Sequence, residues 1–260
     1  MEIPSFGIGT YTLKGENCSN IINSALDIGY RLIDTAELYQ NHLDIAVGIK
    51  KAIDAKTIKR EDLWITSKIH NKDQRKLNIG PAIQQILNNL DTDYLDLILL
   101  HSAQKNYTDA YCELIRCKEH FNIKHIGVSN FRIDELETII NQTNITPYLN
   151  QIEISPFNQR LNLRTFMSKN KILTQGYASL GCGKLFDSEH LKSTNYEPDQ
   201  LLLGWATHYN LKPIPTAHNV EHLYRNYQTL KDIKLEQDNI NKLDNITDIV
   251  CNYKQHQDKF

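Results

Sequence analysis

The sequence lacks an excess of charge of either sign and any long apolar run. Its 29 Lys and Arg residues nearly balance 31 Asp and Glu residues, so nucleic acid and anionic membranes are not expected partners. No apolar run approaches the roughly 20 residues of a membrane span. The first residues also lack the basic segment and apolar stretch of a signal peptide. The composition is that of a globular protein, with 40% hydrophobic and 23% charged residues.

The cysteines are few and irregularly placed. Cys18, Cys112, Cys117, Cys182 and Cys251 show neither zinc-ligand nor redox-pair spacing. An odd number of scattered cysteines is typical of reduced thiols, so we expect a reducing compartment, the cytoplasm. No cluster of His and Cys residues suggests a metal, and we expect no metal site.

A glycine-rich nucleotide-binding turn is also missing. Gly7-Ile-Gly9 lacks the third glycine and the helix start of the dinucleotide-binding fingerprint. A doubly wound sheet with that fingerprint also has fewer strand–helix units than this chain contains. The first apolar run is therefore a poor match to that class of fold.

Short apolar runs instead alternate with longer amphipathic stretches almost from end to end. The runs predict strands at residues 6–9, 30–33, 63–67, 94–100, 124–128, 149–154, 172–177 and 213–215. The amphipathic stretches predict helices at residues 17–29, 43–55, 79–90, 108–120, 133–141, 163–170, 199–209, 220–230 and 237–246. Eight strand–helix units match a (β/α)8 barrel, which needs about 250 residues. We therefore expect one α/β barrel domain, of the TIM-barrel type, over residues 1–260.

Four chemically useful side chains follow neighbouring predicted strands. Asp34, Lys68 and His101 come at the ends of the second, third and fourth strands, and Tyr39 lies on the loop after the second. Active sites of such barrels lie at the carboxyl ends of the strands. Neighbouring parallel strands are ~4.8 Å apart, so we expect these side chains to converge on one pocket.

The four side chains together predict a proton-donating site. A tyrosine with an ordinary pKa of about 10 is a poor acid at neutral pH. We expect Lys68, held by Asp34, to lower the pKa of Tyr39 toward neutrality. A neutral His101 would donate a hydrogen bond to a carbonyl oxygen. Any one of these residues alone is more often structural or solvated, and only their joint arrangement favours carbonyl reduction.

The same residues resemble the Asp, Tyr, Lys and His tetrad of the aldo-keto reductases. The steps from 34 to 39, 39 to 68 and 68 to 101 are 5, 29 and 33 residues, as in that family. Family motifs are matched by Gly9-Thr10-Tyr11, Gly127-Val-Ser-Asn-Phe131 and Asn150-Gln-Ile-Glu153. The resemblance runs from about Phe6 to Asn226. It implies reduction of aldehydes or ketones by a nicotinamide cofactor that supplies the hydride, with Tyr39 as the proton donor.

The resemblance also implies the residues that hold the cofactor. Ser129, Asn130 and Gln151 would bind the carboxamide, which has both donors and an acceptor. Tyr177 would stack on the nicotinamide ring, although a core aromatic is the alternative for it. The full expected set is Thr10, Tyr11, Asp34, Ser129, Asn130, Gln151, Tyr177, Leu180, Thr216, Ala217 and Asn226.

The segment after the last predicted strand departs from the family pattern. The family usually has Lys-Ser and then Arg, which bind the adenosine 2′-phosphate of NADPH, whereas this chain has Thr216-Ala217 and then His222. Arg225, His222 or His218 could replace part of the lost charge-assisted bonding. We therefore expect NADP(H) to be favoured, with NAD(H) possible.

Two more departures lie beside the tetrad. Ser102-Ala103 follows His101 where the family commonly has Trp-Pro, an aromatic wall of the substrate pocket. We therefore expect an open pocket with weak substrate selection. His42 stands where the family often has Glu, so the support behind Tyr39 is expected to differ.

Two other functions stay open at this level. A cofactor-binding regulatory or scaffolding protein with little turnover could use the same barrel, because function depends on the site and not on the fold. An unrelated barrel enzyme would require the matched spacings to be accidental. For the reductase we expect a small-molecule carbonyl substrate, no nucleic acid, no membrane and a monomer.

Overall fold

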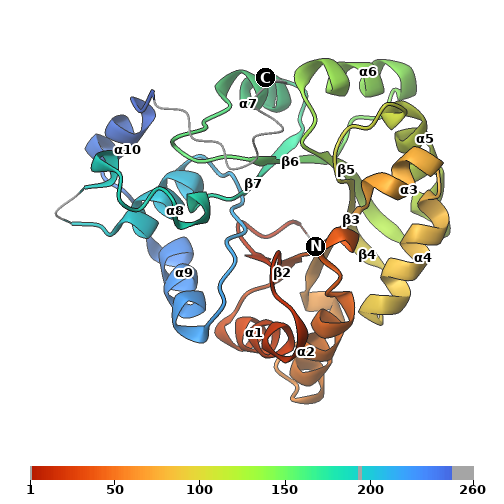
Figure 1. Ribbon diagram of the computed structural model, residues 1–260, viewed down its shortest axis with the longest axis horizontal. Helices are drawn as coiled ribbons and strands as arrows, with labels where there is room; N and C mark the ends of the chain where they lie inside the picture. Colours follow the sequence, from red (N-terminus) through yellow and green to blue (C-terminus); the bar gives the residue numbers. More distant parts are fainter. Residues whose placement is uncertain (1, 193–194, 248–260) are drawn as a thin grey trace.

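Seven parallel strands form the centre of the protein in a computed structural model, which describes residues 2–192 and 195–247. They pair strictly in chain order, from β1 to β7, and the helices surround them (Figure 1). The strands are β1 (Ile8–Gly9), β2 (Leu32–Asp34), β3 (Trp64–Ile69), β4 (Leu95–Leu100), β5 (Ile123–Ser129), β6 (Leu149–Glu153) and β7 (Leu173–Tyr177). The predicted (β/α)8 barrel is confirmed, with one strand position occupied by irregular chain.

The helices follow the predicted stretches closely, and α4 has the predicted bounds. They are α1 (Gly15–Ile28), α2 (His42–Asp54), α3 (Asn71–Lys76), α4 (Ile79–Leu90), α5 (Tyr107–His120), α6 (Ile133–Thr143), α7 (Leu161–Lys169), α8 (Pro198–His208), α9 (Val220–Asp232) and α10 (Gln237–Asp244). The short helix α3 was not predicted, because its sequence has no apolar periodicity. It begins where the side chain of His70 accepts a hydrogen bond from the Lys72 N–H.

The predicted strand at 213–215 is wrong, although the segment does close the barrel. Pro213 and Pro215 have no N–H, so a regular ladder cannot form there. Their carbonyls accept from the N–H groups of Gly7, at 3.1 Å, and Gly9, at 3.2 Å. On the other side Ile214 donates to the Gly176 carbonyl, at 3.2 Å. The segment is therefore bonded to the edges of both β1 and β7.

The closure brings two backbones unusually close. A Cβ atom on Gly9 would lie 2.5 Å from the Ile214 carbonyl oxygen, so any larger residue would push the closing segment away from β1. This contact explains a glycine at the end of the first strand, one residue before Thr10 and the site described below.

Apolar residues fill both sides of the sheet. β4 is buried along its whole length. Ile98 and Leu100 pack in the large cluster beneath the helices, whereas Leu97 and Leu99 join a smaller cluster inside the barrel with Trp64. Burial on both faces explains why the strands are continuous apolar runs.

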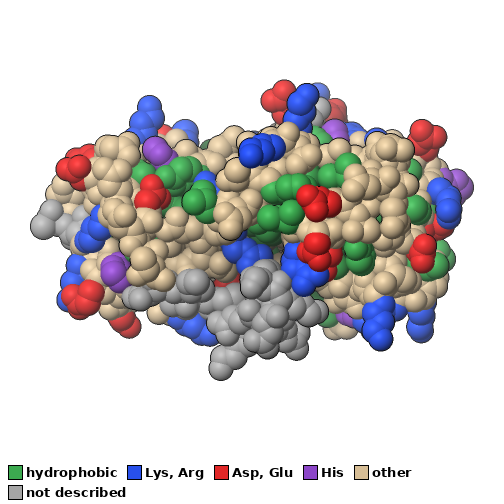
Figure 2. Space-filling view, turned by 90° about the horizontal axis from the view of Figure 1, so that it is seen from above, with side chains coloured by type: hydrophobic (Ala, Val, Ile, Leu, Met, Phe, Trp, Pro, Cys, Tyr) green, Lys and Arg blue, Asp and Glu red, His purple; other side chains and the backbone are tan. Residues whose placement is uncertain are grey.

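The surface mixes charges of both signs. In the view of Figure 2, Lys and Arg side chains alternate with Asp and Glu side chains over the described residues. Among the same described residues, none of the helices combines the length and the apolar character needed to cross a bilayer. The four described cysteines, Cys18, Cys112, Cys117 and Cys182, are free thiols. Cys251, and parts of the predicted domain 1–260, lie outside the described residues.

Candidate active site

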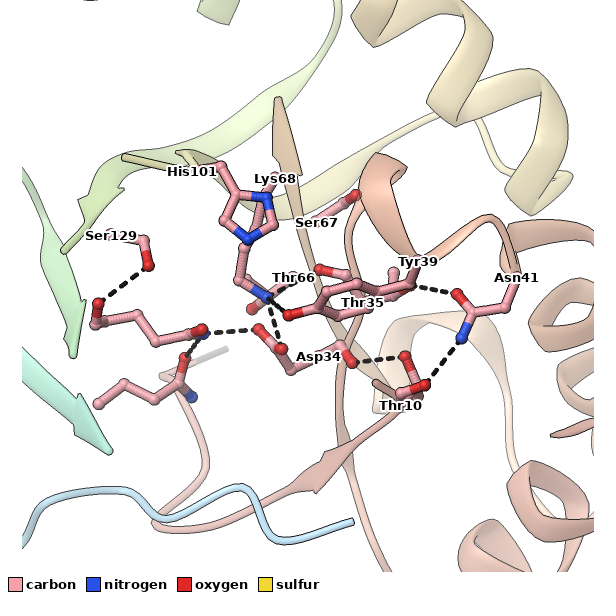
Figure 3. A network of polar contacts seen from close by, with 12 residues as sticks. Thr10, Asp34, Thr35, Tyr39, Asn41, Thr66, Ser67, Lys68, His101 and Ser129 are labelled. Carbon is pink, nitrogen blue, oxygen red and sulfur yellow. Dashed lines mark hydrogen bonds and ion pairs between the residues drawn. The ribbon is translucent and has the colours of Figure 1, made fainter. Parts of the chain in front are cut away.

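The four candidate catalytic residues come together at the carboxyl end of the barrel (Figure 3). The Lys68 ammonium on β3 lies 2.6 Å from the Asp34 carboxylate on β2 and 3.3 Å from the Tyr39 hydroxyl. It also donates to the Thr35 carbonyl, at 3.0 Å. The His101 ring lies edge-on to the Tyr39 ring, with 5.9 Å between centroids. The four side chains therefore lie together, as the spacing along the sequence predicted.

A buried asparagine, which the sequence analysis missed, fixes the loop that carries Tyr39. Asn41 is 1% exposed and its amide oxygen accepts from the Thr35 hydroxyl, at 2.8 Å. Its amide nitrogen donates to the carbonyls of Thr10, at 2.9 Å, and Leu13, at 3.1 Å. Lys14 adds a hydrogen bond to the Tyr39 carbonyl. The only signal in the sequence was an asparagine before a helix start, which usually marks an N-cap.

Asp34 and Lys68 form a buried ion pair. Their side chains are 3% and 1% exposed. Burial raises the pKa of Asp34 and lowers the pKa of Lys68, and in each case the charge of the partner opposes that shift. The Gln151 amide donates a second hydrogen bond to Asp34, at 2.6 Å. Two donors on one carboxylate favour its ionised form.

The pKa of Tyr39 differs from the sequence-based expectation. Burial raises it well above its ordinary value, and the nearby Asp34 carboxylate and Tyr11 add to the rise. The expected fall toward neutrality is wrong because burial of the hydroxyl is the largest influence on this pKa, and the Lys68 ammonium at 3.3 Å does not outweigh it. The raised pKa keeps Tyr39 protonated. The protonated hydroxyl is the form that can give a proton to an oxygen that gains negative charge beside it.

His101 is neutral, as expected. Burial lowers its pKa to about 3, and the Lys68 and His70 charges contribute. Neither of its ring nitrogens has a hydrogen-bond partner among the described residues. Its carbonyl accepts from the Asn130 amide, at 3.2 Å, which fixes the chain after β4. A neutral imidazole has one N–H to offer to an oxygen in the pocket.

The expected carboxamide-binding residues form a polar cluster across the barrel from Lys68. Ser129 ends β5 and donates to the Gln151 carbonyl, at 2.9 Å (Figure 3). Asn130 donates to the Ser129 hydroxyl, at 3.0 Å, and accepts from the Tyr177 hydroxyl, at 2.7 Å. The Gln151 nitrogen donates to Asp34 and also to the Gln175 amide oxygen, at 2.8 Å. Gln175 was not among the expected site residues.

The other residues expected at the cofactor occupy varied positions. Thr10 is fully buried and its hydroxyl donates to the Asp34 carbonyl, at 2.9 Å. This bond fixes the backbone that carries the Asp34 side chain. Tyr11 is 51% exposed, with its ring centroid 5.2 Å from that of Tyr39. Leu180 and Thr216 are half-buried, whereas Ala217 and Asn226 are buried.

Two of the groups expected to replace the missing phosphate-binding cations have partners within the protein. Arg225 forms an ion pair with Asp199, at 2.5 Å. His218 shares a hydrogen bond with the Thr12 hydroxyl, at 2.8 Å. His222 is exposed at the start of α9, and its backbone N–H donates to the Asn219 side chain, at 2.8 Å.

The polar cluster fits the carboxamide of a nicotinamide. Both N–H bonds of the Gln151 amide are used inside the barrel, and its oxygen has no hydrogen-bond partner among the described residues. That oxygen can accept from an amide N–H, while Ser129 and Asn130 supply hydroxyl and amide groups beside it. The described residues contain no group of three or more His, Cys, Asp or Glu that could hold a metal ion.

Comparison with known proteins agrees with this chemistry. Residues 5–195 match the Aldo/keto reductase family, and the chain belongs to this family of nicotinamide-dependent oxidoreductases. The methylglyoxal reductase DkgA of Salmonella typhimurium is 33% identical over 93% of this chain and 88% of its own. The glyoxal reductase of Bacillus subtilis is 32% identical, over 94% and 89% of the two chains.

Solved structures share the whole barrel. The aldose reductase of Schistosoma japonicum superposes with a TM-score of 0.90, at 25% identity, over 99% of this chain and 93% of its own. A Bombyx mori aldo-keto reductase in complex with NADP gives a TM-score of 0.85, at 25% identity, over 93% and 88% of the two chains. The protein is a carbonyl-reducing oxidoreductase on the (β/α)8 barrel of this family.

Proposed function

We propose that this reductase acts on small aldehydes and ketones, with Asp34, Tyr39, Lys68 and His101 as its catalytic residues. The observation that carries the proposal is the 3.3 Å contact between the Tyr39 hydroxyl and the Lys68 ammonium, which Asp34 holds at 2.6 Å. All four side chains come from one chain, so we propose that the protein works as a monomer.

Each residue has a distinct role in this proposal. A bound nicotinamide supplies the hydride. His101 donates its N–H to the carbonyl oxygen and orients it. Tyr39 gives its proton to the oxygen as negative charge develops there. Lys68 then stabilises the phenolate, and Asp34 keeps Lys68 charged and directed at Tyr39.

The rim beside His101 supports a polar substrate class. Ser102 donates to the Asn71 amide oxygen, at 3.1 Å, and Gln104 donates to the Ser102 hydroxyl, at 3.0 Å. Arg75 donates to Gln104, at 2.9 Å. This polar network lies where the family commonly has an aromatic wall. We therefore propose small oxo-aldehydes as the substrate class, in line with the names of the relatives from Salmonella typhimurium and Bacillus subtilis.

A steady-state assay tests the function and its alternative. With NADPH, we expect methylglyoxal and glyoxal to be reduced with kcat/KM roughly tenfold or more above that of an aromatic aldehyde, because one pocket contact discriminates at this scale. An aromatic preference would contradict the substrate class. Cofactor binding with no turnover on any aldehyde would favour the regulatory or scaffolding alternative.

The cofactor preference is a separate proposal, in which NADPH binds more tightly than NADH but by a modest factor. Asp199 competes with the 2′-phosphate for Arg225, which is 48% exposed. We predict that Asp199→Asn frees Arg225 and tightens NADPH binding about three- to tenfold, with NADH unchanged. Fluorescence titration with both nucleotides measures this.

The matched control is Asp232→Asn, an exposed change at the other end of α9. It removes the same charge without touching Arg225, so both affinities should stay at the wild-type value. Equal or tighter binding of NADH by the wild-type protein would contradict NADPH preference. An unchanged NADPH affinity in Asp199→Asn would remove Arg225 from the phosphate site.

A further inference from the structure

Gln175 occupies an unusual position on β7. Its side chain is fully buried inside the barrel. Its amide oxygen accepts from the Gln151 nitrogen, at 2.8 Å, whereas its own nitrogen has no hydrogen-bond partner among the described residues. A buried N–H without a partner is unfavourable. A hydrophobic side chain of similar length would avoid that cost. Stability alone therefore does not account for an amide at this position.

The bond to Gln151 links Gln175 to the ion pair. From Gln175 the contacts run to Gln151 on β6, to Asp34 on β2, at 2.6 Å, and to Lys68 on β3, at 2.6 Å. Lys68 then reaches the Tyr39 hydroxyl. Because β6 and β2 are not neighbours in the sheet, the contact between Gln151 and Asp34 crosses the barrel interior.

The two acceptors around Gln151 fix the direction of its amide. One N–H faces Asp34 and the other faces the Gln175 oxygen. With the amide reversed, the Gln151 oxygen would face the Asp34 carboxylate and the Gln175 oxygen, so two pairs of acceptors would repel each other. If Gln175 offered no oxygen, only Asp34 would oppose the reversal.

We propose that Gln175 is a positioning residue for the reduction. By accepting from Gln151, it keeps the Gln151 N–H directed at Asp34 and the Gln151 oxygen directed away from the carboxylate. Because Gln175 is fully buried, we place its effect on the reaction through Gln151 and not on a ligand. The inference rests on the proposed roles of Asp34, Lys68 and Tyr39.

Gln175→Met tests the proposal, since it keeps the length of the side chain and removes the acceptor. With only Asp34 opposing it, the Gln151 amide reverses more often, which weakens its hydrogen bond to the Asp34 carboxylate and favours the protonated form of that carboxylate. We expect kcat for carbonyl reduction to fall about tenfold, and the acid limb of its pH profile to move to higher pH. The melting temperature should stay level or rise, because the unpartnered N–H is gone.

Gln175→Glu should rescue the rate. A carboxyl group at this fully buried position is held in its protonated form by burial and by the Asp34 charge on the other side of Gln151, and its carbonyl oxygen still accepts from Gln151. We expect kcat within about threefold of wild type and an acid limb close to the wild-type position. Thr174→Val, a conservative change at the adjacent β7 position, is the control for a general disturbance of the strand and should match wild type.

Three results would overturn the proposal: wild-type kcat and pH profile in Gln175→Met, a rate loss in Gln175→Met that only follows a lowered melting temperature, or no rescue by Gln175→Glu. Failure of the proposed function is distinguishable from these. It would show as turnover in Tyr39→Phe, whereas an inactive Tyr39→Phe with an unaffected Gln175→Met would reject Gln175 alone.

Discussion

Tyr39 shows how far a residue's chemistry depends on its surroundings. The spacing of the tetrad predicted which side chains would meet, because strand ends converge in a parallel barrel. The pKa of Tyr39 could not be predicted in the same way. The direction of its shift depends on the burial of the hydroxyl and on the nearby Asp34 carboxylate and Tyr11, and neither the burial nor these distances are visible in the sequence.

His42 carries a prediction on acid stability. It is 4% exposed, shares a hydrogen bond with the Ser67 hydroxyl, at 3.1 Å, and burial lowers its pKa from 6.5 to about 4. Between those values the unfolded chain binds a proton that the folded protein excludes, so stability is complete above pH 6.5 and falls as the pH drops toward 4. The loss amounts to about 3 kcal/mol.

His42→Gln should flatten this pH dependence, because glutamine does not titrate and can still bond to Ser67. Urea unfolding at pH 7 and pH 4.5 measures the difference in the free energy of unfolding, part of which His101 will retain. His208→Gln, an exposed histidine at the end of α8, should keep the wild-type difference. An equal pH dependence in His42→Gln and wild type would reject the account of His42.

At the level of elements, hydrophobic periodicity predicted most of the barrel. The apolar run of β4 and the amphipathic stretch of α4 match the structure closely. Periodicity failed where another interaction decides the local structure. Helix α3 begins with a side-chain cap at His70, and the closing segment at 213–215 is held by carbonyls of two prolines.

The carboxylate at the end of helix α10 joins this helix to α8. Asp244 accepts from the Trp205 indole N–H, at 2.8 Å, and from the Tyr209 hydroxyl, at 2.5 Å, both contributed by α8 and the residue after it. Asp244→Leu would leave both donors without their partner. We predict a loss of about 1–3 kcal/mol in the free energy of unfolding, since the abandoned indole N–H of Trp205 is buried and such a donor costs 1–3 kcal/mol, whereas the half-buried Tyr209 hydroxyl can turn to water.

Urea unfolding measures this loss, and Asp238→Asn on the exposed side of the same helix is the control. The control should stay within about 0.5 kcal/mol of wild type. The turnover number of folded Asp244→Leu should be unchanged, because α10 contributes none of the proposed catalytic residues. Wild-type stability in Asp244→Leu would show that the contact contributes little to holding α10.

At the scale of the whole molecule, the closed barrel explains the site. It places side chains from β2, β3, β6 and β7 in one hydrogen-bonded chain across its interior. The sequence could indicate Asp34 and Lys68, because each follows a predicted strand and belongs to the family tetrad, and Gln151, because it lies in a family motif. It gave no signal for Gln175, since a contact across the barrel depends on which side chains meet in three dimensions.

The most direct test of the central claim is single-turnover reduction by Tyr39→Phe, with cofactor affinity measured on the same protein. The account predicts a rate lower by roughly 10²–10⁴-fold, the usual contribution of a positioned general acid, with cofactor affinity within about twofold of wild type. Tyr107→Phe, which changes a phenol on α5 packed against Phe131, should retain the wild-type rate. A wild-type rate in Tyr39→Phe would contradict the assignment of Tyr39 as the proton donor.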